Sequence, residues 1–217
     1  MKTIVIVGAG PGLGMSIAKK FGKEGYKVAL IARNENKLKN MMVELESLGI
    51  TSKIYTVDIM NTQKFSNTLK KIEIEFGRID IVEFSPYSGT EEFKNVLELT
   101  TEDIEHEYQK YIQSAITIVS NVTKGMKKRG SGAILFTNGI SGIYPMPQLG
   151  NIGIVSAGLR NYANNLHNEL KNSGIYIGFM SIAAKVQKNT KADPQFIANK
   201  WYDMYQKQDV FESVFPE

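Results

Sequence analysis

The sequence predicts an α/β protein in which helices flank a single, mainly parallel sheet. Short apolar stretches rich in β-branched residues alternate with amphipathic segments along the 217 residues, as expected for right-handed crossovers between parallel strands. The first apolar stretch, residues 3–7, runs directly into glycines, and an amphipathic segment containing Ile17, Ala18 and Phe21 follows. A glycine turn between the first strand and the first helix indicates a doubly wound, Rossmann-type sheet with a nucleotide site.

The remaining strands follow from the apolar stretches. We expect them at residues 27–32, 53–57, 79–84, 133–137 and 176–182, with a short seventh strand within 210–215. No repeat, low-complexity segment or linker interrupts the series, so residues 1–217 are predicted to form one domain.

The helices are predicted from the apolar period and from start signals. They are expected after the first turn, from Asn34 to Gly49, over 65–76, from Thr100 to about residue 128, from about 151 to 171, and over 195–205. Asp103 is placed for a capping box with Thr100. Asp193 and Pro194 suit the cap and the first position of the last helix. In the long helix, the apolar period predicts that Ile104 and Tyr108 face the core.

Composition excludes several classes of protein. The chain has no cysteine, which excludes disulfides, thiolate metal sites and a cysteine nucleophile. His106 and His167 are far apart in sequence and have no evident second ligand nearby, so we expect no metal site. No apolar run approaches the ~20 residues of a membrane span, and the N-terminal apolar stretch fits a core strand better than a signal peptide. These features predict a cytoplasmic protein without membrane contact.

The net charge is +4, and the basic residues are spread along the chain. The densest basic cluster is Lys124, Lys127, Lys128 and Arg129, at the expected end of the long helix. The helix dipole favours basic side chains there, and no aromatic residue is interleaved with them. We therefore interpret the cluster as a solvated helix end and predict no nucleic-acid partner.

The spacing of the glycines selects one type of nucleotide motif. A P-loop is excluded because no Gly-Lys-Ser/Thr follows, and Gly-x-Gly-x-x-Gly fails at Leu13 and Met15. The spacing that fits is Gly-x-x-x-Gly-x-Gly, at Gly8, Gly12 and Gly14. In this motif, and over nearly its whole length, the chain resembles the short-chain dehydrogenase/reductase superfamily.

The resemblance implies a set of cofactor-binding residues. These are Gly8, Gly10, Pro11, Gly12, Leu13 and Gly14 in the turn, Asp58 and Ile59 after the third strand, and Ser85 and Pro86 after the fourth. Arg33 follows the second strand, where a basic residue accommodates the 2′-phosphate of NADP and an acidic residue would bind the ribose of NAD. We therefore favour NADP, with NAD as the second choice. The alternative interpretation of Arg33 is a surface ion pair with Glu35 or Glu24.

The same resemblance fails at the positions that carry the chemistry. Members of the superfamily transfer hydride between a nicotinamide and a carbonyl or alcohol, using an Asn-Ser-Tyr-Lys tetrad. The matching positions here hold Tyr111, Gly139, Ile152 and Ser156, and Gly139 lies 13 residues before Ile152 as the family requires. Isoleucine cannot donate a proton and serine supplies no cation. The chain is therefore interpreted as a divergent member of the classical type that lacks the tetrad.

Two classes of function remain open. The first is an NADP(H)-dependent oxidoreductase with a non-standard site for an unidentified carbonyl or alcohol. The alternative is a non-catalytic NADP(H)-binding sensor, or a regulatory or partner subunit. Polar candidates around the nicotinamide are Ser85, Tyr87, Tyr111, Asn138, Ser141 and Tyr144, none of which is singled out as the acid. The resemblance also implies a homodimer or higher homo-oligomer through helices expected at about 101–128 and 154–171.

Overall fold

Within the computed structural model, which describes residues 1–87 and 89–216, seven parallel strands form one sheet in the order β3-β2-β1-β4-β5-β6-β7. The strands are β1 (Thr3–Val7), β2 (Lys27–Ala32), β3 (Ser52–Thr56), β4 (Ile81–Phe84), β5 (Gly132–Gly139), β6 (Ile175–Ile182) and β7 (Glu212–Phe215). The predicted doubly wound, parallel α/β sheet is confirmed. The seventh strand is also present, and it pairs with β6.

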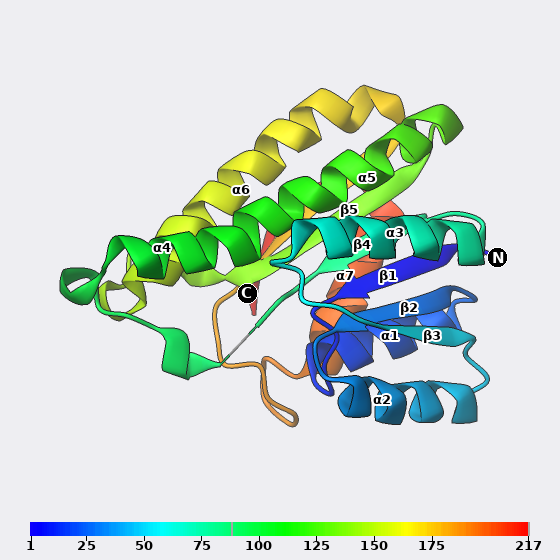
Figure 1. Cartoon of the computed structure of the whole chain (residues 1–217), viewed down its shortest axis with the longest axis horizontal. Helices are drawn as coiled ribbons and strands as arrows, with labels where there is room; N and C mark the ends of the chain where they lie inside the picture. Colours follow the sequence, from blue (N-terminus) through cyan, green and yellow to red (C-terminus); the bar gives the residue numbers. More distant parts are fainter. Residues whose placement is uncertain (88, 217) are drawn as a thin grey trace.

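Helices cover both faces of the sheet (Figure 1). The helices are α1 (Leu13–Lys23), α2 (Glu35–Ser47), α3 (Thr62–Phe76), α4 (Thr101–Glu107), α5 (Ser114–Arg129), α6 (Gly150–Leu170) and α7 (Pro194–Lys207). Alternate strand residues face opposite layers. Val5 and Val7 of β1 contribute to the core under α3, α5 and α6, whereas Ile4 and Ile6 pack in the core under α1, α2 and α7.

The helix starts use the side chains that the sequence indicated. The Asn34 side chain accepts a hydrogen bond from the backbone N–H of Lys37. Thr100 and Asp103 form the capping box at α4. Asp193 caps α7, and Pro194 occupies its first turn.

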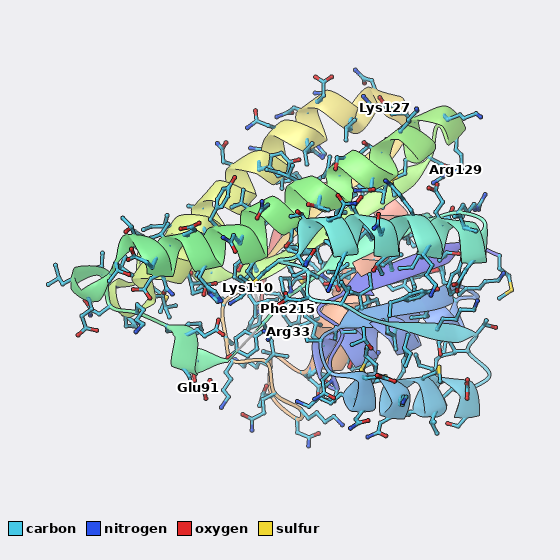
Figure 2. All side chains as sticks on the ribbon, in the orientation of Figure 1. Arg33, Glu91, Lys110, Lys127, Arg129 and Phe215 are labelled. Carbon is cyan, nitrogen blue, oxygen red and sulfur yellow. The ribbon has the colours of Figure 1, made fainter. Side chains whose placement is uncertain are left out.

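The long helix differs from the prediction in its middle. A π-helical segment, η3 (Tyr108–Gln113), separates α4 from α5. The extra residue in such a turn shifts the helical phase. Tyr108 is 45% exposed, so its predicted place in the core is wrong. Lys110 and Tyr111 are buried instead. Lys110, labelled in Figure 2, pairs with Glu92 and Glu107, and the Tyr111 hydroxyl reaches the loop after β4.

No helix within residues 1–87 and 89–216 has both the length and the hydropathy that crossing a bilayer requires. Lys127, Lys128 and Arg129 of the basic cluster lie in the last turn of α5 as expected, and Figure 2 shows Lys127 and Arg129 at the upper right, with Arg33 near the centre of the view. Part of the cluster is structural, because the Arg129 guanidinium donates to the backbone carbonyl of Ile79 at 2.6 Å.

Candidate functional site

The site lies at the carboxyl edge of the sheet, where the strand order reverses. β1 pairs with β2 on one side and with β4 on the other, so the connections leave β1 and β4 in opposite directions. Open α/β sheets bind ligands in the crevice at this switch point. The backbone N–H groups of Gly8 and Ala9 donate to the Ile31 carbonyl at 3.1 and 2.9 Å, which fixes the turn after β1 against β2.

Gly8 is required by its backbone and by its surroundings. Its φ is +92°, and an added Cβ would lie 2.7 Å from both the Pro86 Cα and the Ser85 carbonyl oxygen. The turn after β1 therefore touches the loop after β4 directly. Gly14 lets α1 pack closely, because a Cβ there would lie 3.1 Å from the Cα of Ala9.

Gly10 and Gly12 differ from Gly8, because nothing in the described chain lies within 4 Å of a Cβ added at either position. The space in front of the turn is open, and side chains there would fill it. Gly12 caps α1 without any side-chain hydrogen bond, and the first turn contains no acidic residue. Pro11 is exposed and Leu13 is half-buried beside the opening. The unpaired N–H groups and the positive end of the α1 dipole suit a phosphate, so the turn fits the pyrophosphate of a dinucleotide.

A surface pocket of about 450 Å³ lies at the carboxyl ends of β2 and β3. It is lined by Arg33, Thr56, Val57, Asp58, Asn61 and Lys64. The structure thus places Arg33 and Asp58 in one pocket, as a site for the adenosine half of a dinucleotide requires. The alternative ion pairs for Arg33 are absent from the described residues, because Glu35 pairs with Lys39 and Glu24 with Lys20.

Asp58 also organises its own loop. Its Oδ1 accepts a hydrogen bond from the backbone N–H of Met60 at 3.0 Å, and the side chain is exposed. Half-buried Ile59 follows, and its carbonyl accepts from the Ser114 hydroxyl at 3.1 Å. This bond ties the β3 loop to the start of α5.

The loop after β4 forms the other wall of the opening. The backbone N–H of Ser85 donates to the Val7 carbonyl at 3.0 Å, and both Ser85 and Pro86 are half-buried. The hydroxyl of Tyr111 donates to the Pro86 carbonyl at 3.1 Å. Burial, with the nearby Glu107 and Glu92 carboxylates, raises the pKa of Tyr111. Its proton is therefore held in a structural hydrogen bond.

The positions that the family resemblance assigns to chemistry come together around α6. Gly139 ends β5, and Ile152 and Ser156 lie one turn apart on α6, 7% and 0% exposed. Tyr111 belongs to the same apolar cluster as Ile152. Tyr87 and Tyr144 are 65% and 61% exposed. Neither is held by a hydrogen bond within the described chain.

Three buried polar atoms in this region have no hydrogen-bond partner among the described residues. They are Asn138 Nδ2, Ser141 Oγ and Ser156 Oγ. They lie close together, because a Cβ on Gly142 would be 3.0 Å from Ser156 Cβ, and one on Gly139 would be 3.9 Å from Ser141 Oγ. Unsatisfied groups of this kind are costly and are characteristic of places where a ligand or water completes the bonding.

Sequence reasoning missed a buried carboxylate beneath the same loop. Glu83 lies within the apolar strand β4 and is 0% exposed. Its Oε1 accepts from Thr137 Oγ1 at 2.9 Å, and its Oε2 lies 3.0 Å from Ser85 Oγ. Burial raises the pKa of Glu83 to about 8, and the two hydrogen bonds oppose the rise. A charged residue within an otherwise apolar predicted strand is the sequence signal that could have identified this buried carboxylate.

A second buried charged group lies in the π-helical region. Lys110 Nζ bonds to Glu92 and, at 3.2 Å, to Glu107. His106, Glu92 and Glu107 bring ligand atoms within 4.8 Å of one another. The expectation that no second ligand lies near His106 is therefore wrong. The ammonium of Lys110 already bonds to both carboxylates, so the cluster is explained as an ion-pair network.

Comparisons with known proteins agree with this geometry. The family model described as short chain dehydrogenase matches residues 2–195. A very-long-chain 3-oxoacyl-CoA reductase of Anas platyrhynchos is 30% identical over 197 residues, covering 86% of this chain and 62% of the relative. The chain thus spans less than two thirds of that relative. An uncharacterized oxidoreductase of Staphylococcus epidermidis is 25% identical over 180 residues, covering 83% of this chain and 76% of the relative.

Solved structures share the fold. The L-sorbose reductase of Gluconobacter frateurii, complexed with NADPH and L-sorbose, has a TM-score of 0.88 at 19% identity and covers 98% of this chain and 94% of that one. A metagenomic short-chain oxidoreductase in complex with NADP has a TM-score of 0.86 at 17% identity and covers 98% of this chain and 94% of that one.

Proposed function

Because the chain belongs to the short-chain dehydrogenase family, we propose that it is an NADP(H)-dependent oxidoreductase that acts on a carbonyl or alcohol through a non-standard active site. The observation that carries the proposal is the open glycine turn. Its two unobstructed glycines, Gly10 and Gly12, lead into the N-terminus of α1, where no side chain caps the backbone N–H groups. A pocket lined by Arg33 lies at the carboxyl ends of β2 and β3.

Different residues of the chain would bind different parts of the cofactor. The turn from Gly8 to Gly14 would hold the pyrophosphate, Asp58 and Ile59 the adenine, and Ser85 with Pro86 the nicotinamide side. Arg33 would hold the 2′-phosphate, because a guanidinium makes charge-assisted hydrogen bonds to phosphate oxygens. When bound, a nicotinamide dinucleotide supplies or accepts a hydride.

The non-standard part of the proposal concerns the proton. Under the family alignment, Ile152 replaces the tyrosine acid and Ser156 replaces the lysine. Loss of a general acid costs typically ~10²–10⁴-fold in rate. Slow turnover, or turnover with a different proton donor, follows from this replacement.

The test is a titration of the purified protein with NADPH and with NADH, followed by nicotinamide fluorescence, and then a turnover assay on a broad carbonyl panel. Saturable binding with NADPH tighter than NADH, together with turnover, is expected. Saturable binding without turnover would favour the non-catalytic sensor. Absence of binding would reject both forms of the proposal.

We also propose that α5 and α6 form a homodimer face. Ile116 on α5 and Ile154 on α6 are 42% and 52% exposed, although both lie in helices whose other faces pack on the sheet. Ile116→Glu and Ile154→Glu should each halve the mass measured by light scattering. Ile74→Glu is the control, because Ile74 is 82% exposed on α3. A wild-type monomer would contradict the proposal.

A further inference from the structure

Four side chains form a continuous hydrogen-bonded path from the carboxyl edge of the sheet to α7. Trp201 Nε1 donates to Thr137 Oγ1 at 2.8 Å, and Thr137 Oγ1 donates to Glu83 Oε1 at 2.9 Å. Glu83 Oε2 and Ser85 Oγ are 3.0 Å apart. Ser85, which is half-buried beside the glycine turn, is the member closest to the proposed cofactor site.

The direction of this path is fixed at its inner end. The indole N–H of Trp201 can only donate, so Thr137 Oγ1 accepts from it. The single hydroxyl hydrogen of Thr137 then goes to Glu83, which makes Oε1 an acceptor. The direction of the remaining bond, between Glu83 Oε2 and Ser85 Oγ, depends on whether Glu83 carries a proton.

The surroundings of Glu83 favour the neutral acid. Its neighbours in register on β1 and β5 are Ile6 and Leu135, and α7 contributes Trp201, none of which is charged. The side chains of α1 that are buried in this layer are also uncharged; they are Met15, Ile17, Ala18 and Phe21.

The titratable side chains of the same layer bond elsewhere. Tyr26 and Lys2 bond to Tyr205, and Tyr176 donates to the Val210 carbonyl. On β4 itself, Asp80 pairs with Arg78 before the strand begins. Burial without a charged partner raises the pKa of Glu83 to about 8, which leaves the carboxyl mostly neutral at pH 7.

We propose that Glu83 is a positioning residue for Ser85, which would donate its hydroxyl hydrogen to an oxygen of the bound nicotinamide dinucleotide. The neutral carboxyl donates from Oε2 to Ser85 Oγ, so the Ser85 hydrogen is free to point out of the sheet edge. This inference rests on the proposed function, because it needs the dinucleotide at that edge.

Ionisation of Glu83 reverses the last bond. Both carboxylate oxygens then accept, and the Ser85 hydroxyl turns inward to donate to Oε2. The donor offered to the cofactor is withdrawn, with no covalent bond made or broken. Binding of the dinucleotide should therefore weaken as pH rises through about 8. A single neutral hydrogen bond corresponds to a change in affinity of roughly three- to tenfold.

The first experiment measures the dissociation constant of NADPH from about pH 6.5 to about pH 9.5. Wild type should weaken roughly three- to tenfold across this range. Glu83→Gln should bind as wild type does at low pH and should lose the step, because the amide accepts from Thr137 and donates to Ser85 at every pH. Ser85→Ala should bind weakly throughout and also show no step. Glu46→Gln, an exposed glutamate on α2, is the matched control and should keep the wild-type step.

The second experiment needs no cofactor. Trp201 is the single tryptophan of the chain, so its fluorescence reports on the path to Glu83. Its emission should change in a step as pH passes about 8 in wild type and in Glu46→Gln, and this step should be absent in Glu83→Gln. Circular dichroism over the same range should show that each variant stays folded.

The outcomes separate the inference from the proposed function. NADPH binding by wild type with a pH step that persists in Glu83→Gln overturns the inference and leaves the proposed function intact. A Glu83→Gln variant that is folded but binds more weakly at low pH also overturns it. Failure of wild type to bind NADPH at any pH rejects the proposed function, and the inference with it.

Discussion

The two halves of the sheet edge differ in how they present polar groups. In the half formed by β1, β2 and β3, the glycine turn is open and Arg33 lines a pocket at the surface. In the half formed by β4, β5 and β6, several polar groups are buried, either inside hydrogen-bonded networks such as that of Glu83 or, as at Ser141 and Ser156, without a partner among the described residues.

Under the proposed function, binding and chemistry would depend on separate features of one fold. The half formed by β1, β2 and β3, called the dinucleotide half below, would bind through backbone geometry and through the end of α1. The half formed by β4, β5 and β6, called the chemical half below, would instead depend on a few side chains, including those at the positions of Ile152 and Ser156. Variants that act on one half and leave the other unchanged therefore test binding and chemistry separately.

The largest effect is expected from Gly8→Ala, because Gly8 lies where the two halves meet. A side chain at φ +92° is strained, and its Cβ would overlap backbone atoms of Ser85 and Pro86. We expect a loss of stability of about 1–3 kcal/mol, from the strained backbone alone. We also expect NADPH affinity to fall by about 10²-fold, because the turn would move away from the phosphates. Thermal unfolding and nicotinamide fluorescence measure the two effects.

Gly25→Ala is the control for backbone strain. Gly25 has a φ of +86° with nothing within 4 Å of an added Cβ, and it lies after α1, away from the site. This variant should lose stability and keep its NADPH affinity. If Gly8→Ala bound NADPH as wild type does, the turn would not be the phosphate site and the comparison between the halves would fail.

The second effect concerns the dinucleotide half alone. Arg33→Asp should weaken NADPH by roughly 10- to 100-fold, since a hydrogen bond to a charged group contributes about 1.5–3 kcal/mol. NADH, which has no 2′-phosphate, should change little or bind more tightly. Lys39→Asp makes the same change of charge on α2, where Lys39 pairs with Glu35, and should leave both affinities unchanged. Equal losses for both nucleotides with Arg33→Asp would remove the assignment to NADP.

The sequence predicted the geometry of the half formed by β1, β2 and β3 because its features are local. A strand, a turn with glycines at set spacings and a helix start occupy fourteen consecutive residues. Arg33 and Asp58 each follow directly from the end of a predicted strand, and the parallel sheet brings both strand ends to one edge. Local periodicity and the parallel rule are sufficient for such a site.

The other half could not be predicted in the same way. The Glu83 path joins β4, β5 and α7, so it depends on strand register and on a helix that lies over a hundred residues later. Tyr108 was wrongly placed in the core because a uniform period of 3.6 residues does not include the π-helical segment that begins there, whereas the later members of the predicted stripe, such as Ala115 and Val122, are buried. Where long-range pairing decides which polar groups meet, the sequence predicts their presence and not their partners.

The smallest effect is expected from Tyr111→Phe, and it tests whether the chemical half uses a tyrosine at all. The variant loses the 3.1 Å bond to the Pro86 carbonyl, which should lower the free energy of unfolding by about 1 kcal/mol. That bond already engages the hydroxyl hydrogen, so kcat should change by less than about threefold. Loss of a general acid would instead lower kcat by ~10²-fold or more. Measuring kcat beside the unfolding free energy separates the roles. A large fall in kcat at unchanged stability would make Tyr111 the proton donor, and the proposed site would then differ from the family pattern by a displaced tyrosine.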